Sequence, residues 1–447
     1  YIKDCKSNDV WSAGYQPVCV EAGQYEVSFA EDRVRFARED QFIFTEMEVF
    51  VSPEENAEIR RLKLTNRSQM KRELEITSYA EVVLNTIGAD LAHPAFSNLF
   101  IQTEFNAKIS ALIASRRPRS NKDKQHWMMH ALRVDRCSTG VIQYETSRSQ
   151  FLGRGRDVKN PSAIFDNEKL KGTVGAVLDP ILSLRTRVII EPGQTAHLVF
   201  STGIAESREA IEIMSEKYSD ISIFDRVSDL AWTQAQVKLH HLGIESDEAH
   251  LYQRLTTRLV YSDPSLRAPS EILRKNTKDV ASLWAHGISG DHPIILVGID
   301  DLEDRNLVRQ LLKAQIYFAT KAFITDLVIL NEKQSSYSQE LQLALQNLAQ
   351  TAHVPSDISI TCGKVFVLRG DLISEADHIL LACEARVILS SRNGSLSDQV
   401  KRTRLNSTPT IHLEKPVMKK SMDWFVPELE FFNGYGGFTR DGENYVV

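Results

Sequence analysis

Cysteine is scarce in this chain of 447 residues, and its five cysteines are widely scattered. No two of them form a CxxC pair, and none has a spacing to histidine that would hold zinc. We therefore expect a reducing cytoplasm and no metal site. The five positions are Cys5, Cys19, Cys137, Cys362 and Cys383.

Long apolar runs and an excess of positive charge are also missing. No run reaches the roughly 18 apolar residues that cross a bilayer, and the first 30 residues lack a basic flank before an apolar core. The formal net charge of -6 gives no broad basic field, so neither nucleic acid nor direct membrane insertion is expected. The chain begins at Tyr1 without a methionine, which suggests a piece of a larger protein.

Several motifs of catalysis and cofactor binding are absent. The chain has no GxSxG elbow and no HExxH, which disfavours serine hydrolases and metalloproteases. No glycine-rich phosphate loop follows a strand-like run, so we expect no cofactor. Its 59 Asp and Glu residues are too many for the carboxylate pair of a glycosidase to be chosen by spacing.

The hydrophobic pattern divides the chain into four parts. Residues 1–205 alternate with a period of two between turn formers, as in FIFTEMEVFV (42–51) and RELEITSYAEVVL (72–84), which predicts a large antiparallel β-sandwich. Residues 206–270 have helical periodicity, with Ser207 as the expected N-cap of the first helix, and predict a helical linker. Residues 271–405 alternate helices with the short apolar strands IILVGI (294–299), DLVILN (326–331) and VFVL (365–368), which indicates a small parallel α/β unit. Residues 406–447 are interpreted as the truncated start of a second β-sandwich.

The stretch LWAHGISGDHPI offers one candidate carbohydrate site. Trp284 would stack on a sugar ring while His286 and Asp291 bind hydroxyls. Alternatively, Trp284 docks the linker, and the glycines at 287 and 290 with Asp291 only form a turn before the strand.

Two further loops carry candidate binding residues. Arg154 and Arg156 flank a glycine and would bind an anion or a sugar through forked hydrogen bonds, unless they form structural salt bridges. His93 lies in a polar loop that would line a pocket, although a lone histidine is more often structural.

Polar residues follow the apolar strands of the α/β unit. Ligands of open α/β sheets gather beyond the carboxyl ends of strands, so Asp301, Glu332 and Asp371 form an alternative site, with Asp300, Asn331 and Arg369 beside them. A glycosyltransferase or phosphorylase activity in the chain itself would be placed there. The competing interpretation is that these residues cap helices and close turns.

Long motifs of the chain resemble a known family. The sequence is similar to the large bacterial cyclic β-1,2-glucan synthases, and more narrowly to their C-terminal region, which is related to the family 94 glycoside phosphorylases, formerly glycosyltransferase family 36. The resemblance covers nearly the whole chain. It rests on YIKDCKSNDVWSAGYQP (1–17), SYAEVVL (78–84), HPAFSNLF (93–100), RRPRS (116–120), FLGRGR (151–156), LDPILSLR (178–185), AWTQAQ (231–236), LWAHGISGDHPI (283–294), DLVILNE (326–332) and FFNGYGGFTRDG (431–442).

The resemblance implies a parent enzyme that polymerises glucose from UDP-glucose, cyclises the chain and adjusts its length. It places that enzyme at the cytoplasmic face of the bacterial inner membrane. It also implies a super-sandwich of the galactose mutarotase type joined by linker helices to an (α/α)6 barrel. The expected partners are β-1,2-glucan, or another glucose-containing oligosaccharide, and the remaining modules of the synthase.

This chain departs from the family in one respect that decides its expected role. The catalytic acid of the family lies in a barrel motif resembling TGDWNDG, and no such segment occurs here. We therefore assign no catalytic residue and leave open whether the chain is itself an enzyme. The predicted function is a non-catalytic, carbohydrate-binding or scaffolding region that supports glucan synthesis and chain-length control.

Overall fold

The computed structural model describes residues 1–118, 120, 125–135, 138–261, 263–333, 338–351, 362–401, 428–433 and 436–446. Its contacts divide the chain into two compact units. The first unit comprises residues 1–257, 309–325 and 347–364, and the second comprises residues 258–308, 326–346 and 365–447. The four parts predicted from the sequence are a different division, and their boundaries stay a prediction.

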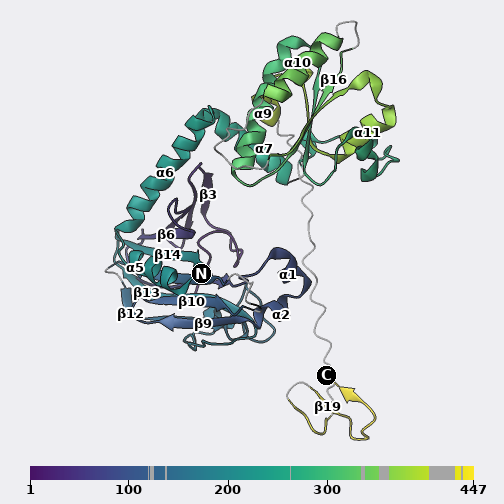
Figure 1. Cartoon of the computed structure of the whole chain (residues 1–447). Coiled ribbons are helices and arrows are strands. Elements are labelled where there is room, and N and C mark those ends of the chain that lie inside the picture. The colour runs from purple at the N-terminus through teal and green to yellow at the C-terminus, as the bar shows by residue number, and fades with distance from the viewer. Residues whose placement is uncertain are drawn as a thin grey trace. The chain divides into compact units, whose positions relative to one another are not determined.

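The first unit is built on an eight-stranded antiparallel sheet (Figure 1). Most of its neighbouring strands follow each other in the chain, but β14 enters the middle between β6 and β11. The strand order is β3 (Gln24–Phe29), β4 (Arg33–Asp40), β5 (Ile43–Val51), β6 (Ala57–Asn66), β14 (Thr195–Ala205), β11 (Trp127–Val134), β10 (Ala111–Arg116) and β9 (Ile101–Asn106).

A second antiparallel sheet faces the first and completes a sandwich. The side chains between the two sheets form an apolar core that includes Leu62, Leu64, Leu74, Ile76 and Leu184. The predicted sandwich is therefore confirmed. The second sheet has the order β12 (Ser138–Ser147), β13 (Pro180–Ile190), β7 (Arg72–Thr77), β1 (Ile2–Asp4) and β2 (Val10–Trp11), and β8 (Ala80–Glu81) also pairs with β13.

The alternating run at residues 72–84 does not form one continuous strand. The structure has β7 and the two-residue β8, with Ser78 between them. The hydroxyl of Ser78 accepts a hydrogen bond from the backbone N–H of Leu184 at 3.0 Å. A side chain thus takes part in the pairing with β13, and the regular ladder is interrupted at this residue.

Helices cover the other face of the eight-stranded sheet. Helix α5 (Arg208–Lys217) begins after Ser207, whose hydroxyl accepts from the N–H of Ala210 and caps the helix. Ile211 and Met214 of α5 and Phe224 of α6 (Ile223–His241) pack with Ile59 of β6 and its neighbours in a second apolar cluster. The short helices of this unit are α1 (Ile87–Ala92), α2 (Pro94–Asn98), α3 (Arg148–Leu152) and α4 (Ser162–Phe165).

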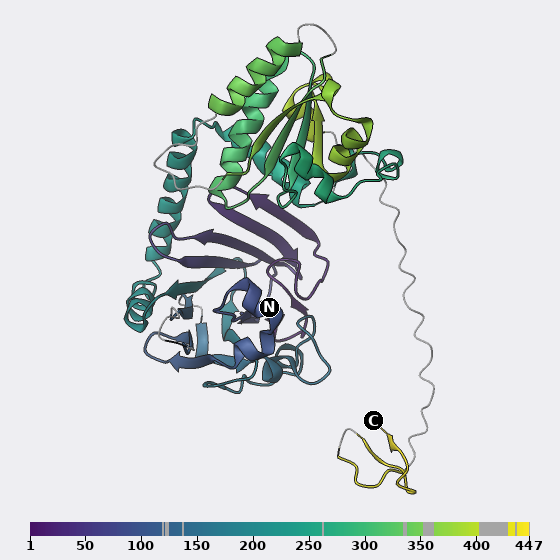
Figure 2. The same ribbon diagram turned by 45° about the vertical axis from the view of Figure 1, so that its right-hand side comes forward.

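The second unit contains a four-stranded parallel sheet, drawn in green to yellow-green in Figure 2. Two of its strands have the bounds that the sequence predicts, and the predicted parallel α/β fold is confirmed. The spatial order is β17 (Val365–Arg369), β16 (Asp326–Asn331), β15 (Ile294–Ile299) and β18 (Ala385–Ser390). The chain therefore places β16 and β17 on one side of β15 and then places β18 on the other side.

The fourth strand, β18, is absent from the sequence-based prediction. It begins at Ala385, directly after α11 (Glu375–Glu384) ends, so no turn former marks the change. Leu380 and Leu381 of α11 pack with residues of the sheet such as Leu296 and Val328. A largely apolar sequence, interrupted by Glu384 and Arg386, therefore forms first a helix and then a strand.

The remaining elements are mostly short, and none of the helices in the described part of the chain is long and apolar enough to span a membrane. Helices α7, α9 and α10 each contain residues of both units. Of the predicted second sandwich (406–447), residues 406–427, 434, 435 and 447 lie outside the described residues. The elements are α7 (Ser246–Val260), η1 (Pro264–Leu266), α8 (Ser270–Leu273), η2 (Val280–His286), η3 (Leu302–Asp304), α9 (Arg305–Thr320), α10 (Ser338–Thr351), η4 (Gly370–Leu372), η5 (Ser391–Asn393), α12 (Leu396–Lys401), β19 (Gly437–Phe438) and β20 (Tyr445–Val446).

Candidate functional site

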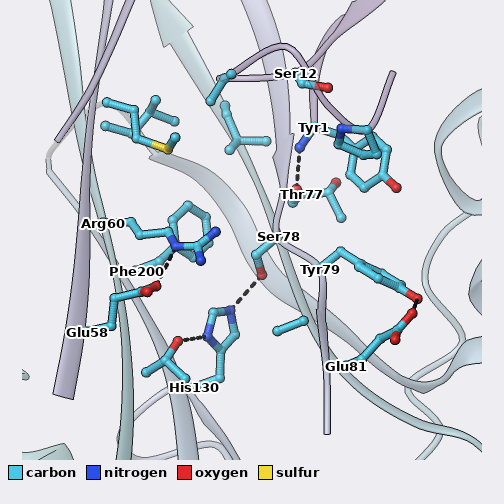
Figure 3. A pocket seen from close by; sticks show the side chains of 18 of the residues that line it. Tyr1, Ser12, Glu58, Arg60, Thr77, Ser78, Tyr79, Glu81, His130 and Phe200 are labelled. Carbon is cyan, nitrogen blue, oxygen red and sulfur yellow. Dashed lines mark hydrogen bonds and ion pairs between the residues drawn. The ribbon is translucent and has the colours of Figure 1, made fainter. Parts of the chain in front are cut away.

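A pocket of about 920 Å³ lies between the two sheets of the sandwich (Figure 3). Its walls combine apolar side chains of the core with a few polar groups, which is the usual lining of a small-molecule site. The labelled residues are Tyr1, Ser12, Glu58, Arg60, Thr77, Ser78, Tyr79, Glu81, His130 and Phe200.

The pocket lies where the inward-facing side chains of the strands change from apolar to polar. Side chains on one face of a strand recur every second residue. On β6 that face buries Leu62 and Leu64 in the core and then presents Glu58 and Arg60 to the pocket. Because β14 pairs with β6 in register, its Thr202 stands opposite Glu58. The same sheet therefore supplies both the core and the polar wall of the pocket.

His130 connects the two sheets at the base of this polar wall. One ring nitrogen lies 2.8 Å from the hydroxyl of Ser78, and the other lies 2.9 Å from the hydroxyl of Thr202. Burial, with a smaller contribution from the charge of Arg60, lowers the pKa of His130 to about 3. The imidazole is thus neutral at physiological pH, and both of its nitrogens are occupied.

The ionic groups of the pocket are more accessible than His130. Arg60 donates to Glu58 at 2.6 Å, and these side chains are 51% and 38% exposed, so both can also contact a ligand. On the opposite sheet, the hydroxyl of Tyr79 donates to Glu81 at 2.8 Å. Burial, more than the neighbouring Glu81, raises the pKa of Tyr79, so its phenol stays protonated. Hydrogen-bonding groups therefore line both walls.

Sequence analysis does not identify this pocket. A pattern in the sequence nevertheless indicates it once the structure is known: polar residues occupy inward-facing positions of three strands. They are Glu58 and Arg60 on β6, His130 on β11 and Thr202 on β14. The sequence alone does not reveal that those polar residues meet, because the pairing of β14 between β6 and β11 joins residues far apart in the chain.

The residues predicted at the strand ends separate into different environments. Asp301 caps η3 by accepting from the N–H of Glu303, and it lies 3.8 Å from Lys333. Asp371 pairs with Arg369 at 2.6 Å, and this carboxylate is 43% exposed. Glu332 lies instead beside Arg392, at 3.8 Å. For Asp301 and Asp371 the observed contacts agree with the capping and salt-bridge interpretation, and a role as a joint site stays a prediction.

The three residues of the LWAHGISGDHPI stretch have separate contacts. The ring of Trp284 is 66% exposed, and its N–H donates to the backbone oxygen of Ser289 at 3.2 Å. His286 faces Asp377 of α11 at 3.6 Å. The backbone N–H of Asp291 donates to the hydroxyl of Ser289 at 3.3 Å. Trp284 is therefore available for stacking, but a shared sugar site stays a prediction.

The loop candidates lie apart from the sandwich pocket. Arg156 forms an ion pair with Asp166 at 2.7 Å, and Arg154 is exposed. His93 is exposed at the junction of α1 and α2, where its backbone oxygen accepts from the N–H of Ser97. None of these three residues lines the sandwich pocket, and their proposed binding roles stay predictions.

Among the described residues, no group of three or more His, Cys, Asp or Glu side chains is arranged to hold a metal ion. The side chains that line the sandwich pocket offer hydrogen bonds and apolar contacts to a ligand. An apolar floor with polar walls suits a ligand with both hydroxyl groups and C–H faces.

Comparison with known proteins identifies the sandwich. Residues 1–221 match the family model described as glycosyl hydrolase 94, supersandwich domain. This part of the chain is therefore similar to that domain, and the pocket lies within the matched residues. The supersandwich fold expected from the resemblance is confirmed.

Relatives of the whole chain support the same conclusion. The chain is 33% identical over its full length to the cyclic beta-(1,2)-glucan synthase NdvB of Rhizobium meliloti (strain 1021), of which it covers 16%. Half of the chain is 23% identical to the N,N'-diacetylchitobiose phosphorylase of Vibrio furnissii, of which it covers 27%. The solabiose phosphorylase of Paenibacillus borealis is likewise 23% identical over 48% of the chain. The resemblance to cyclic glucan synthases is confirmed, and the chain spans a minor part of each relative.

Proposed function

We propose that this chain is a non-catalytic, carbohydrate-binding and scaffolding region of a cyclic β-1,2-glucan synthase. In this proposal it supports glucan synthesis and chain-length control at the cytoplasmic face of the bacterial inner membrane, together with the other modules of the synthase. The observation that carries the proposal is the pocket of about 920 Å³ within a supersandwich domain whose relatives are named for glucan and disaccharide chemistry.

The lining of the pocket supports binding rather than reaction. The volume lies in the range of roughly 300–1,000 Å³ that is typical of small-molecule sites. Glu58 and Arg60 supply an acceptor and a donor that are only half-buried, whereas His130 is neutral and has both nitrogens occupied. A histidine in that state is poorly suited to exchange protons near pH 7. Sugar hydroxyls would be recognised by the ionic pair and the C–H face by the apolar floor.

Calorimetric titration of the full chain with linear and cyclic β-1,2-glucans tests the proposal, with released glucose 1-phosphate assayed in the presence of phosphate. We expect binding without product. Arg60→Gln should weaken binding about ten- to a hundredfold, because a charge-assisted hydrogen bond contributes about 1.5–3 kcal/mol. Arg208→Gln is the matched control: Arg208 is 46% exposed, is also ion-paired, and does not line the pocket.

The outcomes separate the parts of the proposal. A flat titration with every glucan would overturn carbohydrate binding, and formation of glucose 1-phosphate would overturn the non-catalytic role. Equal weakening by Arg60→Gln and Arg208→Gln would remove the pocket from the proposal, because only the first variant alters its wall.

A further inference from the structure

A second location for a ligand follows from the topology of the parallel sheet. The strands run β15, β16 and β17 to one side, and the chain then returns to place β18 on the other side of β15. The chain leaves β15 toward β16 on one side, and β18 pairs with β15 on the other side. The strand order therefore changes direction between β15 and β18, and open α/β sheets bind ligands at such a switch point. The residues that follow these two strands are Asp300 and the Ser391–Arg392 pair.

These residues contact each other at the carboxyl ends of the strands. The guanidinium of Arg392 donates two hydrogen bonds to the carboxylate of Asp300, one of them 2.7 Å long. The backbone N–H of Asp300 donates to the hydroxyl of Ser391 at 3.3 Å. The carboxylate of Asp300 and the side chain of Arg392 are thus fixed at the switch point, while Arg392 remains 70% exposed.

Glu332 completes the group from the end of β16. Its backbone N–H pairs with the oxygen of Ile299, but within the described part of the chain its carboxylate makes no hydrogen bond. The nearest cation is Arg392 at 3.8 Å, and the side chain is 35% exposed. Gly298 makes room for it, since an added Cβ there would lie 2.8 Å from the carboxyl carbon of Glu332. Among the described residues, this half-buried carboxylate therefore has no hydrogen-bond donor and is available to accept from a ligand.

The surrounding charges restrict the ligand. Burial and then the charge of Asp300 raise the pKa of Glu332, and these effects outweigh the opposing charges of Arg392 and His378. Two carboxylates against one guanidinium disfavour a phosphate, and no glycine-rich loop follows β15. No set of three metal-ligating side chains is present among the described residues either. A neutral ligand with several hydroxyl groups fits, because its hydroxyls donate to carboxylates and accept from Arg392.

We propose that the switch point between β15 and β18 is a saccharide-binding site in which Glu332, Asp300 and Arg392 bind the hydroxyl groups of a neutral glucosyl unit. The site is separate from the sandwich pocket and does not depend on it. Glu332 is its principal acceptor, and Asp300 acts mainly by holding Arg392.

The test uses the full chain and the β-1,2-linked glucose disaccharide as probe. The carboxyl resonance of Glu332 is assigned by carbon-13 NMR and followed during the titration. We expect the resonance to move, and its pKa to fall, because donated hydroxyl hydrogen bonds favour the charged carboxylate. Glu332→Gln should weaken binding at this site about tenfold while leaving the fold intact by circular dichroism.

Asp371→Asn is the matched control, because it also removes one carboxylate charge at the same edge of the sheet but acts at β17. It should leave the affinity unchanged. Arg60→Gln distinguishes the two sites: it should weaken binding in the sandwich pocket and leave the shift at Glu332 intact.

Three results would overturn the proposal: no shift at Glu332 with the disaccharide, equal weakening by Glu332→Gln and Asp371→Asn, or a stronger response to glucose 1-phosphate or Mg²⁺ than to the disaccharide. Failure of the sandwich pocket would not mimic any of these, since the Glu332 resonance reports only on the second site.

Discussion

The sandwich and the parallel sheet differ in the burial and hydrogen bonding of their charged side chains. In the sandwich, Arg185 of β13 is 2% exposed, and its hydrogen bonds reach the hydroxyl of Thr77 and the backbone oxygens of Ala163 and Glu168. In the parallel sheet, Glu332 is partly exposed and its carboxylate has no hydrogen bond among the described residues. A buried charged side chain whose hydrogen bonds are all made within the protein contributes to the fold. A partly exposed carboxylate without a hydrogen-bond donor is suited to binding a ligand.

Removing Arg185 should give the largest effect. Arg185→Met leaves the backbone oxygens of Ala163 and Glu168 without their buried donor. It also removes one of the two cations beside the buried Glu75, so we expect the free energy of unfolding to fall by about 3–5 kcal/mol. Arg208→Met on α5 is the control, because Arg208 and its partner Glu212 are 46% and 43% exposed and surface ion pairs contribute about 1 kcal/mol or less. Denaturant unfolding of both variants measures the difference. If both variants lost the same free energy of unfolding, the larger effect expected for the buried arginine would be contradicted.

The pH dependence of stability should reveal His130. Its folded pKa of about 3 lies below its ordinary value near 6.5, so the unfolded chain binds the additional proton as the pH falls. Stability from this group is present above pH 6.5 and is lost toward pH 3, by about 2 kcal/mol at pH 5. His130→Gln should remove that part of the pH dependence, whereas substitution of the exposed His240 by Gln should not. Thermal unfolding between pH 5 and pH 8 provides the measurement, and equal pH dependence in all three proteins would refute the assignment.

Two glycine substitutions compare the packing of the units. In the sandwich, Gly203→Ala places a methyl group against Met214 of α5, and overpacking of this kind costs about 1–3 kcal/mol. In the parallel sheet, Gly298→Ala meets only the movable carboxylate of Glu332, so the cost should stay below about 1 kcal/mol. Gly298→Ala should instead weaken disaccharide binding at the switch point. Unfolding and titration of both variants test this, and a larger stability loss for Gly298→Ala would reverse the comparison.

Much of the fold follows from the sequence because strand and helix periodicities are local. The strands at Ile294–Ile299 and Asp326–Asn331 are predicted with the observed bounds, since each is a short, fully apolar run next to polar residues. The N-cap at Ser207 is also local and marks the start of α5 correctly. The supersandwich is anticipated by alternation and by long family motifs, and the family match confirms it.

The candidate sites depend on tertiary structure. The sequence groups Glu332 with Asp300, Asp301 and Asp371, whereas in the structure Glu332 lies near Asp300 and Arg392, and Arg392 is not part of the predicted group. That difference comes from β18, because no turn-forming residue in the sequence marks its start. Its position next to β15 is set by packing and backbone pairing. Likewise, Glu58, His130 and Thr202 meet only because β14 inserts between β6 and β11. The sequence by itself determined the kinds of element and the family, because those depend on residues close together in the chain. Tertiary structure decided which polar side chains share a site, because strand order joins residues that no local pattern connects.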